Sequence, residues 1–304
     1  MEANHPSALT PPGSNRIVQL VRRYPLAAFF TMAYAFTWII STPYVLSSWG
    51  ILKGDYLPLF ILKPFAGPTL SAVLVTAALD GKPGLRRLRE RMSWRTARWR
   101  WVLISLVAIP ALLLLGMLVQ PSLAASFQGL TAKAVVSYPI YLVIVFFGVA
   151  LPEEIGWRGF ALPRMQPRYG PLWGTLLLGV LWAFWHLLFF LTPDHGGGPG
   201  ANPVQVLISF AIFLVMVVAL SIIFTWVFNH TGGSVFMANL VHACIDTPQL
   251  VWVPLFLAAS ESTLDLACLI GFGLPALLIL LLTRGRLGYP EAKSLETEPA
   301  AAGV

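Results

Sequence analysis

The chain contains long, almost unbroken apolar runs, and these constrain its fold more than any other feature. A helix needs about 20 mostly apolar residues to cross the hydrocarbon core of a bilayer. Because lipid offers no partners for free backbone groups, such runs must form helices or a closed barrel, and the alternation of barrel strands is missing here. The sequence therefore predicts an all-α, polytopic membrane helical bundle of about eight transmembrane helices. The runs cover residues 26–47, 57–79, 101–120, 135–151, 171–191, 204–228, 235–258 and 266–282.

The composition excludes an ordinary soluble domain. Only 11% of the 304 residues are charged, and the mean hydropathy is +0.74. Soluble domains carry roughly 25% charged residues, so this chain has too few polar side chains to cover a surface that faces water. The net charge of +7 could suit nucleic acid. Many of the basic residues, however, cluster in the loop 80–100 between two apolar runs, which is typical of a topology signal, and we expect no nucleic-acid partner.

The basic residues fall mainly on one side of the predicted bundle. They precede the first run, fill the loop 80–100, and follow the fourth and the last runs. The other side holds Lys53 and Lys133, while Lys63 lies within the second run. The positive-inside rule then places both termini in the cytoplasm. We therefore expect a multi-pass protein of the cell (inner) membrane, in contact with lipid.

These patterns divide the chain into segments. They are a cytoplasmic N-terminal segment (1–24), N-terminal transmembrane helices with the basic loop 80–100 (25–134), a core (135–258), a last transmembrane helix (259–287) and a disordered tail (288–304). The tail is predicted to be disordered because it is polar and alanine-rich.

Ionisable residues just after the fourth run, between two apolar runs, are the first candidates for function. Glu153 and Glu154 are adjacent, and Arg158 follows four residues after Glu154. A charge near the bilayer centre costs about 2.5–3.5 kcal/mol, so such groups usually pair, line a wet cavity or do chemistry. Residues four apart share a helical face, which predicts a Glu154–Arg158 ion pair and leaves Glu153 for general-base work. A purely structural glutamate–arginine clamp is the alternative, but it leaves Glu153 unexplained.

Two further runs carry histidines. Trp182 and His186 are four residues apart, and so are His242 and Asp246, so each pair can share a helical face. Taken alone, His186 fits a hydrogen-bonded core residue better than a catalytic one. His242 with Asp246 fits a helix-packing hydrogen bond as well as it fits a functional pair. Together with the glutamates and the arginine, they make up nearly all the strongly polar groups of the last five runs. This concentration of acid–base and ligand types favours a single functional site.

The ordered set Glu-Glu-x-x-x-Arg, aromatic-x-x-x-His and His-x-x-x-Asp, each in a successive membrane segment, resembles the type II CAAX prenyl endopeptidase family. The bacterial members of this family are also grouped as CPBP intramembrane proteases. The resembling region runs from about residue 135 to residue 255. The resemblance implies that the protein is an intramembrane endopeptidase. Its substrate would be a peptide or protein that is membrane-associated or lipidated.

The resemblance also implies a role for each residue of the motifs. Glu153 would activate water for attack on a peptide carbonyl, and His186 would orient or deprotonate that water. His242 and Asp246 would stabilise the oxyanion, and Glu154 and Arg158 would brace the site. Two positions depart from the usual pattern: Trp182 stands where phenylalanine is common, and Asp246 where asparagine is common. An ionised Asp246 would repel an oxyanion, so it must be protonated, orient His242 or bind a metal.

A metal and the direction of access are separate questions. His186 and His242 with Glu153 match a two-histidine, one-carboxylate zinc site in ligand type, whereas the His-Glu-x-x-His helix is absent. We favour a mechanism without a cofactor and without a tightly bound metal. Counting along the helices puts His242 about 10 Å and His186 about 22 Å from the cytoplasmic starts of their runs. We expect the site to open toward the cytoplasm.

Two other function classes compete with a protease. One is a non-enzymatic membrane protein of the same fold, such as a bacteriocin immunity or maturation partner. The other is a proton-coupled transporter, in which buried Glu, His and Asp side chains form a relay. The absence of recognisable repeated halves counts against the transporter.

Overall fold

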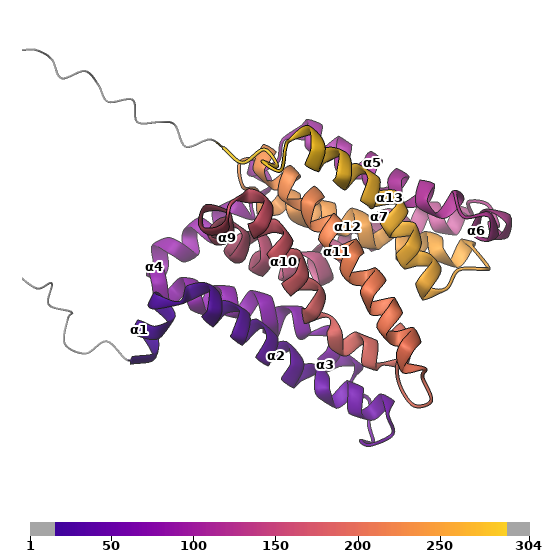
Figure 1. The fold of residues 1–304 in the computed structure, drawn as a ribbon, viewed down its shortest axis with the longest axis horizontal. Coiled ribbons are helices and arrows are strands. Elements are labelled where there is room, and N and C mark those ends of the chain that lie inside the picture. Colours follow the sequence, from indigo (N-terminus) through magenta and orange to yellow (C-terminus); the bar gives the residue numbers. More distant parts are fainter. Residues whose placement is uncertain (1–15, 291–304) are drawn as a thin grey trace, which may run out of the picture.

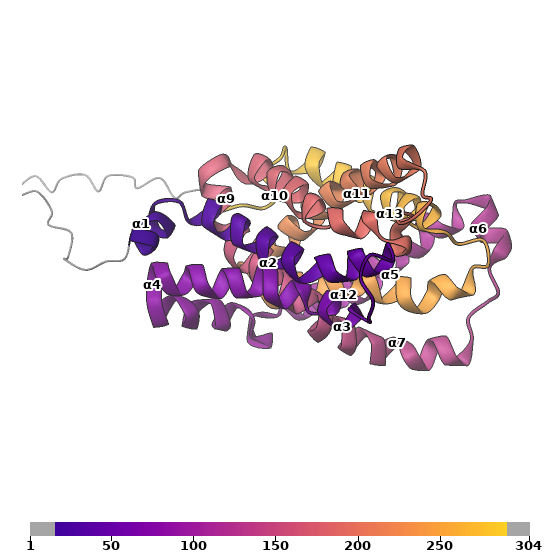
Figure 2. The same ribbon diagram turned by 90° about the horizontal axis from the view of Figure 1, so that it is seen from below.

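The computed structural model describes residues 16–290 and shows an elongated bundle of helices (Figures 1 and 2). The segments 1–15 and 291–304, which include most of the predicted N-terminal segment and tail, lie outside the described residues. The α-helices are α1 (Arg16–Arg23), α2 (Pro25–Ser48), α3 (Leu57–Ile61), α4 (Leu70–Arg91), α5 (Trp99–Leu118), α6 (Pro121–Ser126), α7 (Ala132–Val145), α8 (Leu151–Gly156), α9 (Leu162–Tyr169), α10 (Pro171–Trp185), α11 (Pro203–His230), α12 (Val235–Trp252) and α13 (Glu261–Leu282). Short 3₁₀ and π-helical segments join several of them.

The predicted all-α membrane bundle is confirmed for the described chain. By length and composition, the structure has six helical segments able to cross a membrane: Pro25–Ser48, Trp99–Leu118, Ala132–Tyr169, Pro171–Leu191, Pro203–His230 and Thr263–Leu282. All six overlap runs predicted from the sequence. The predicted runs 57–79 and 235–258 are not among the six, and a local feature of each run explains why it does not form a membrane-spanning helix of this kind.

The run 57–79 is interrupted. Helix α3 ends at Ile61, a π-helical segment follows at Phe65–Thr69, and α4 continues to Arg91. Pro64 and Pro68 lack the backbone N–H that a continuous α-helix needs at those positions, which accounts for the break. The backbone of α4 is non-helical at Gly81, so part of the basic loop 80–100 forms the helical segment that follows this kink.

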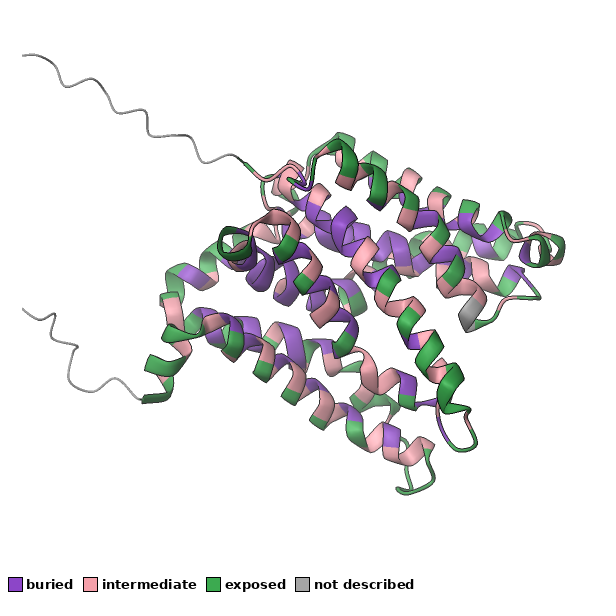
Figure 3. Ribbon diagram, in the orientation of Figure 1, coloured by how far each residue is buried: buried purple, intermediate pink, exposed green. Residues whose placement is uncertain are grey.

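Helix α12 lies in the middle of the bundle, although it is short and carries polar groups. Almost every residue from Val235 to Ile245 is buried, and Figure 3 shows this region as one of the most buried parts of the molecule. His242, Asp246 and Gln249 lower the hydropathy of α12 below that of the neighbouring spans. The N-terminal part of α12, from Val235 to Ile245, is therefore enclosed by other helices.

The segment from Ala132 to Tyr169 is continuous helix, but it is not regular. Helix α8 is flanked by the π-helical segments Phe146–Ala150 and Trp157–Ala161. Such π-bulges are frequent at functional sites because they rotate the side chains that follow them. At Gly156 an added Cβ would lie 2.5 Å from Pro68 Cβ, so glycine is required for α8 to pack this closely on the π-helical segment Phe65–Thr69.

The predicted charge asymmetry has a counterpart in space. Figures 1 and 2 show α1, α9 and the C-terminal end of α4 at one end of the molecule, together with the chain after α13. These elements carry most of the basic residues. Both ends of the described chain lie here, as expected if the termini share one side of the membrane, whereas α3 and α6 lie away from this end.

Candidate active site

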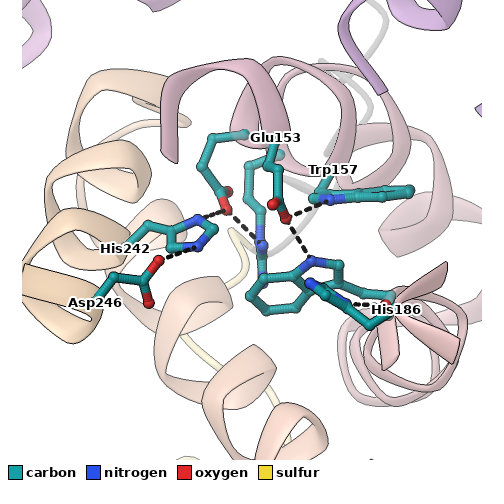
Figure 4. A network of polar contacts seen from close by, with 8 residues as sticks. Glu153, Trp157, His186, His242 and Asp246 are labelled. Carbon is teal, nitrogen blue, oxygen red and sulfur yellow. Dashed lines mark hydrogen bonds and ion pairs between the residues drawn. The ribbon is translucent and has the colours of Figure 1, made fainter. Parts of the chain in front are cut away.

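Glu154 and Arg158 form an ion pair in the interior of the bundle. The Arg158 Nη1 atom donates to Glu154 Oε1 over 2.9 Å, and both side chains are fully inaccessible to solvent. This confirms the pair predicted from their spacing. The same Glu154 oxygen contacts His242 Nδ1 at 2.9 Å, so the carboxylate joins α8 to α12 (Figure 4). The guanidinium also faces the rings of Trp182 and Phe224, at 4.4 and 4.0 Å from their centroids.

Glu153 has different surroundings from those of Glu154. Its Oε2 atom accepts hydrogen bonds from the indole N–H groups of Trp182, at 2.9 Å, and of Trp157, at 3.4 Å. Among residues 16–290, no hydrogen bond reaches its Oε1 atom, and Glu153 lines a cavity. The two indoles therefore fix one carboxylate oxygen and leave the other for a ligand or water.

The structure also explains why position 182 is tryptophan. The indole N–H of Trp182 supplies the shorter of the two bonds to Glu153, which a phenylalanine cannot make. Trp157 contributes the second bond, and the sequence interpretation did not include it. The spacing could have indicated this contact, since Trp157 follows Glu153 by four residues and shares its helical face.

His186 lies at the C-terminal end of α10. Its Nδ1 atom is 2.9 Å from the carbonyl oxygen of Trp182. A carbonyl oxygen can only accept, so Nδ1 must carry the proton, and in the neutral ring Nε2 is then an acceptor. The imidazole packs edge-to-face on Trp185 and Phe213. This fixed tautomer is the form needed to accept a hydrogen bond from water.

Helix α2 holds the end of α10 in place. The Tyr34 hydroxyl and the Trp38 indole donate to the carbonyl oxygens of Leu181 and Trp185, and the Trp185 indole donates to Thr37. The Trp38 bond gives a partner to the carbonyl group of Trp185, one of the last four of α10, which have none within the helix. The N-terminal helices thus help to position His186, a role that the sequence did not reveal.

His242 lies between two carboxylates. Its Nδ1 atom contacts Glu154 at 2.9 Å, and its Nε2 atom contacts Asp246 Oδ2 at 3.4 Å. The predicted meeting of His242 and Asp246 is confirmed, although 3.4 Å is beyond the usual range for a strong hydrogen bond. The side chain of Asp246 is 31% exposed, whereas that of His242 is 7% exposed. Asp246 is thus placed to orient His242.

The candidate groups share one cavity. A cavity of about 520 Å³ is lined by Glu153, Trp182, His186, His242 and Asp246. Glu154 and Arg158 lie behind its wall. In the view of Figure 4, Glu153 lies between the two histidines. A volume of this size is within the range of cavities that bind small ligands, about 300–1,000 Å³.

The side chains do not form a metal site as they are arranged. Within residues 16–290, no three His, Cys, Asp or Glu side chains are grouped so that they could hold a metal ion. The three ligands considered from the sequence, His186, His242 and Glu153, do not form such a group. Both ring nitrogens of His242 also already face carboxylates.

Arg91 supports the site from the basic end of the molecule. Its guanidinium donates to the carbonyl oxygens of Arg158, Gly159 and Gly233, at 3.2, 3.1 and 3.0 Å. Burial lowers the pKa of Arg91 to about 10, which leaves it charged at neutral pH. Arg91 therefore ties α4 to the segment after α8 and to the turn before α12.

The lining of the cavity extends to elements outside the sequence motifs. It includes Phe60 of α3, His195 of the loop before α11, and Leu264 of the first turn of α13. Helix α3 lies away from α1 and α9, the end that gathers the basic segments (Figures 1 and 2). The opening of the site toward the cytoplasm stays a prediction.

Two comparisons relate the chain to known proteins. Residues 135–248 match the family described as Type II CAAX prenyl endopeptidase Rce1-like. The chain is also similar to CAAX prenyl protease 2 of Methanococcus maripaludis, with 22% identity over 232 residues, which cover 75% of this chain and 84% of the relative. The matched segment contains all of the candidate residues from Glu153 to Asp246.

Proposed function

We propose that this protein is a membrane protease that cleaves peptides with water activated by Glu153, since residues 135–248 match the Type II CAAX prenyl endopeptidase Rce1-like family. The observation that carries the proposal is the contrast between the two glutamates. Glu154 is paired with Arg158 and His242. Glu153 has one oxygen held by two indole N–H groups, and it lines the cavity. A general base needs a carboxylate that is held in place but is not neutralised by an ion pair.

Hydrolysis then follows in two steps. Glu153 accepts a proton from water while the water oxygen attacks the carbonyl carbon of the scissile bond. The carbon–nitrogen bond of the tetrahedral intermediate breaks as the protonated Glu153 returns the proton to the leaving nitrogen. The products are a new carboxyl group and a new amine, and no step draws on a metal or another cofactor.

The two histidines take different parts. The Nε2 atom of His186 accepts a hydrogen bond from the attacking water, because Nδ1 is occupied by the Trp182 carbonyl oxygen. His242 holds Nδ1 against Glu154 and can turn its Nε2–H from the long contact with Asp246 to the oxyanion. Donors aimed at developing negative charge are commonly the largest contribution to such reactions. Asp246 orients His242 and does not itself contact the oxyanion.

The substrate is a peptide or protein that reaches the cavity from the membrane or its surface. The relative is named as a prenyl protease, so a lipidated CAAX peptide is the first substrate to test. The six apolar helices of the described chain support an integral membrane location, and the cell membrane is the proposed site of action.

The proposal is tested with the purified full-length protein in lipid nanodiscs and a series of lipidated and unmodified peptides. Glu153→Gln should lower kcat by about 10²- to 10⁴-fold, the usual contribution of general acid–base catalysis. Glu90→Gln, in an exposed ion pair with Arg86, is the control and should retain wild-type turnover. Equal turnover by Glu153→Gln and wild type contradicts the proposal.

A further inference from the structure

Lys63 is a charged residue on the cavity wall that the proposed reaction does not use. It lies between α3 and the π-helical segment at Phe65–Thr69, and its side chain lines the same cavity as Glu153 and His186. The ammonium nitrogen is 3.9 Å from the ring centroid of Phe60 and 3.4 Å from that of Phe189. Aromatic faces attract cations, so the two rings hold the ammonium group in place.

Lys63 forms no ion pair with any described residue. Within residues 16–290, its ammonium group takes part in no hydrogen bond and no ion pair. Glu153 lines the same cavity, but no salt bridge joins it to Lys63. Burying an ammonium group disfavours its charged form unless an anion is nearby. A bound anion would therefore remove an existing cost.

The charges of the cavity are arranged asymmetrically. Three carboxylates line it: Asp246 and Asp265 on the wall formed by α12 and α13, and Glu153 on α8. Lys63 is the sole lysine or arginine that lines the cavity in the described part of the chain, and it lies on the wall formed by α3 and the segment after α10. A ligand with one negatively charged group is thus directed to the Lys63 side. The remaining lining, which includes Leu57, Val149 and Phe213, is mostly apolar.

We propose that Lys63 binds a carboxylate of the peptide substrate, so that the scissile bond lies against Glu153. The inference rests on the proposed peptidase function and adds a determinant of specificity to it. A peptide offers two sources of this group, its free C-terminus and an Asp or Glu side chain. Hydrogen bonds to charged groups contribute about 1.5–3 kcal/mol, which corresponds to about 10- to 100-fold in affinity.

Binding is measured first, so that the result does not depend on hydrolysis. The probes are three pools of N-acetylated six-residue peptides with randomised apolar sequence. One pool ends in a free carboxylate, one in an amide, and one in an amide preceded by glutamate. The Glu153→Gln protein in nanodiscs should bind the free-carboxylate pool about 10-fold or more tightly than the plain amide pool. The glutamate pool shows whether a side-chain carboxylate serves as well.

Lys63→Met keeps an unbranched side chain that is one atom shorter and removes its charge. In the Glu153→Gln background, it should bring the free-carboxylate and amide pools to within about twofold of each other, whereas Lys63→Arg should keep a preference for the carboxylate. The control is Lys53→Met, an exposed lysine near α3, which should leave the ratio unchanged. Thermal melting of each variant checks that the bundle is folded.

The inference is overturned if the Glu153→Gln protein binds the carboxylate and amide pools equally or binds neither. A ratio that Lys63→Met does not change overturns it as well. The preference for the free-carboxylate pool over the amide pool is then measured as a ratio of kcat/KM values with the protein that retains Glu153. A carboxylate preference in binding without any peptide cleavage would refute the peptidase proposal and leave the binding role of Lys63 standing. Cleavage without a carboxylate preference would refute the binding role of Lys63 and leave the peptidase proposal standing.

Discussion

Glu153 and Glu154 are neighbours in the chain, but they belong to two regions with opposite properties. Glu154 lies in an interior network with Arg158 and His242, in which its side chain is fully buried and ion-paired. Glu153 lies on the cavity wall, held by two indoles and facing a space of about 520 Å³. Since adjacent helical residues point about 100° apart, one turn of α8 serves both regions. The interior network supplies rigidity, and the cavity wall supplies the reactive group.

This comparison predicts its largest stability effect at Glu154. Breaking a buried ion pair by removing one partner costs about 3–5 kcal/mol, because the other charge is left uncompensated. Glu154→Gln should therefore lower the melting temperature of the nanodisc-embedded protein far more than Glu153→Gln does. Glu90→Gln breaks an exposed pair of the same spacing and should cost at most about 1 kcal/mol. Equal melting temperatures for Glu154→Gln and Glu90→Gln would contradict the division into two regions.

A smaller effect is expected where the two regions meet, at the indoles. Trp182→Phe keeps the ring against Arg158 but removes the 2.9 Å bond to Glu153. It should lower kcat by about 10- to 100-fold, the range for a hydrogen bond to a charged group. Trp157→Phe removes the longer, 3.4 Å bond and should cost less. If Trp157→Phe were the more damaging variant, the assignment of Trp182 as the main support of Glu153 would be wrong.

Asp246 should matter less than either indole. Its contact with His242 is long, and its side chain is partly exposed. Asp246→Asn keeps an acceptor oxygen for His242 Nε2–H, so kcat/KM should fall by less than about 10-fold, or 1.4 kcal/mol. Complete loss of turnover in this variant, with the fold intact, would give Asp246 a direct part in the reaction.

Metal removal should have the smallest effect. Among residues 16–290, no group of side chains is arranged to hold a metal ion, and the proposed steps use none. Incubation with a strong chelator followed by gel filtration should leave kcat/KM within about twofold of the untreated protein. Loss of activity that added zinc restores would require a rearranged site built from His186, His242 and Glu153.

The sequence predicted the parts of this architecture that depend on local spacing. The Glu154–Arg158 pair and the meeting of His242 with Asp246 follow from a separation of four residues, and the structure confirms both. The apolar runs predicted the helical bundle, because lipid permits few alternatives. The assignment of catalytic roles to Glu153, His186 and His242 stays a prediction.

Contacts between distant segments could not be predicted from spacing. Lys63 looked like a stray charge in the run 57–79, and only the break between α3 and α4 brings it to the cavity. Likewise, the bonds from Tyr34 and Trp38 to the end of α10 each join residues that are 147 positions apart in the sequence.

The most direct test of the role of Glu153 is single-turnover cleavage of a bound peptide by wild type and Glu153→Gln, measured across neutral pH. The account predicts that the wild-type rate depends on the deprotonation of one group, as expected for a general base. The Glu153→Gln rate should be about 10²- to 10⁴-fold lower and should lack that dependence. A Glu153→Gln rate close to that of wild type, with the same pH dependence, would contradict the account.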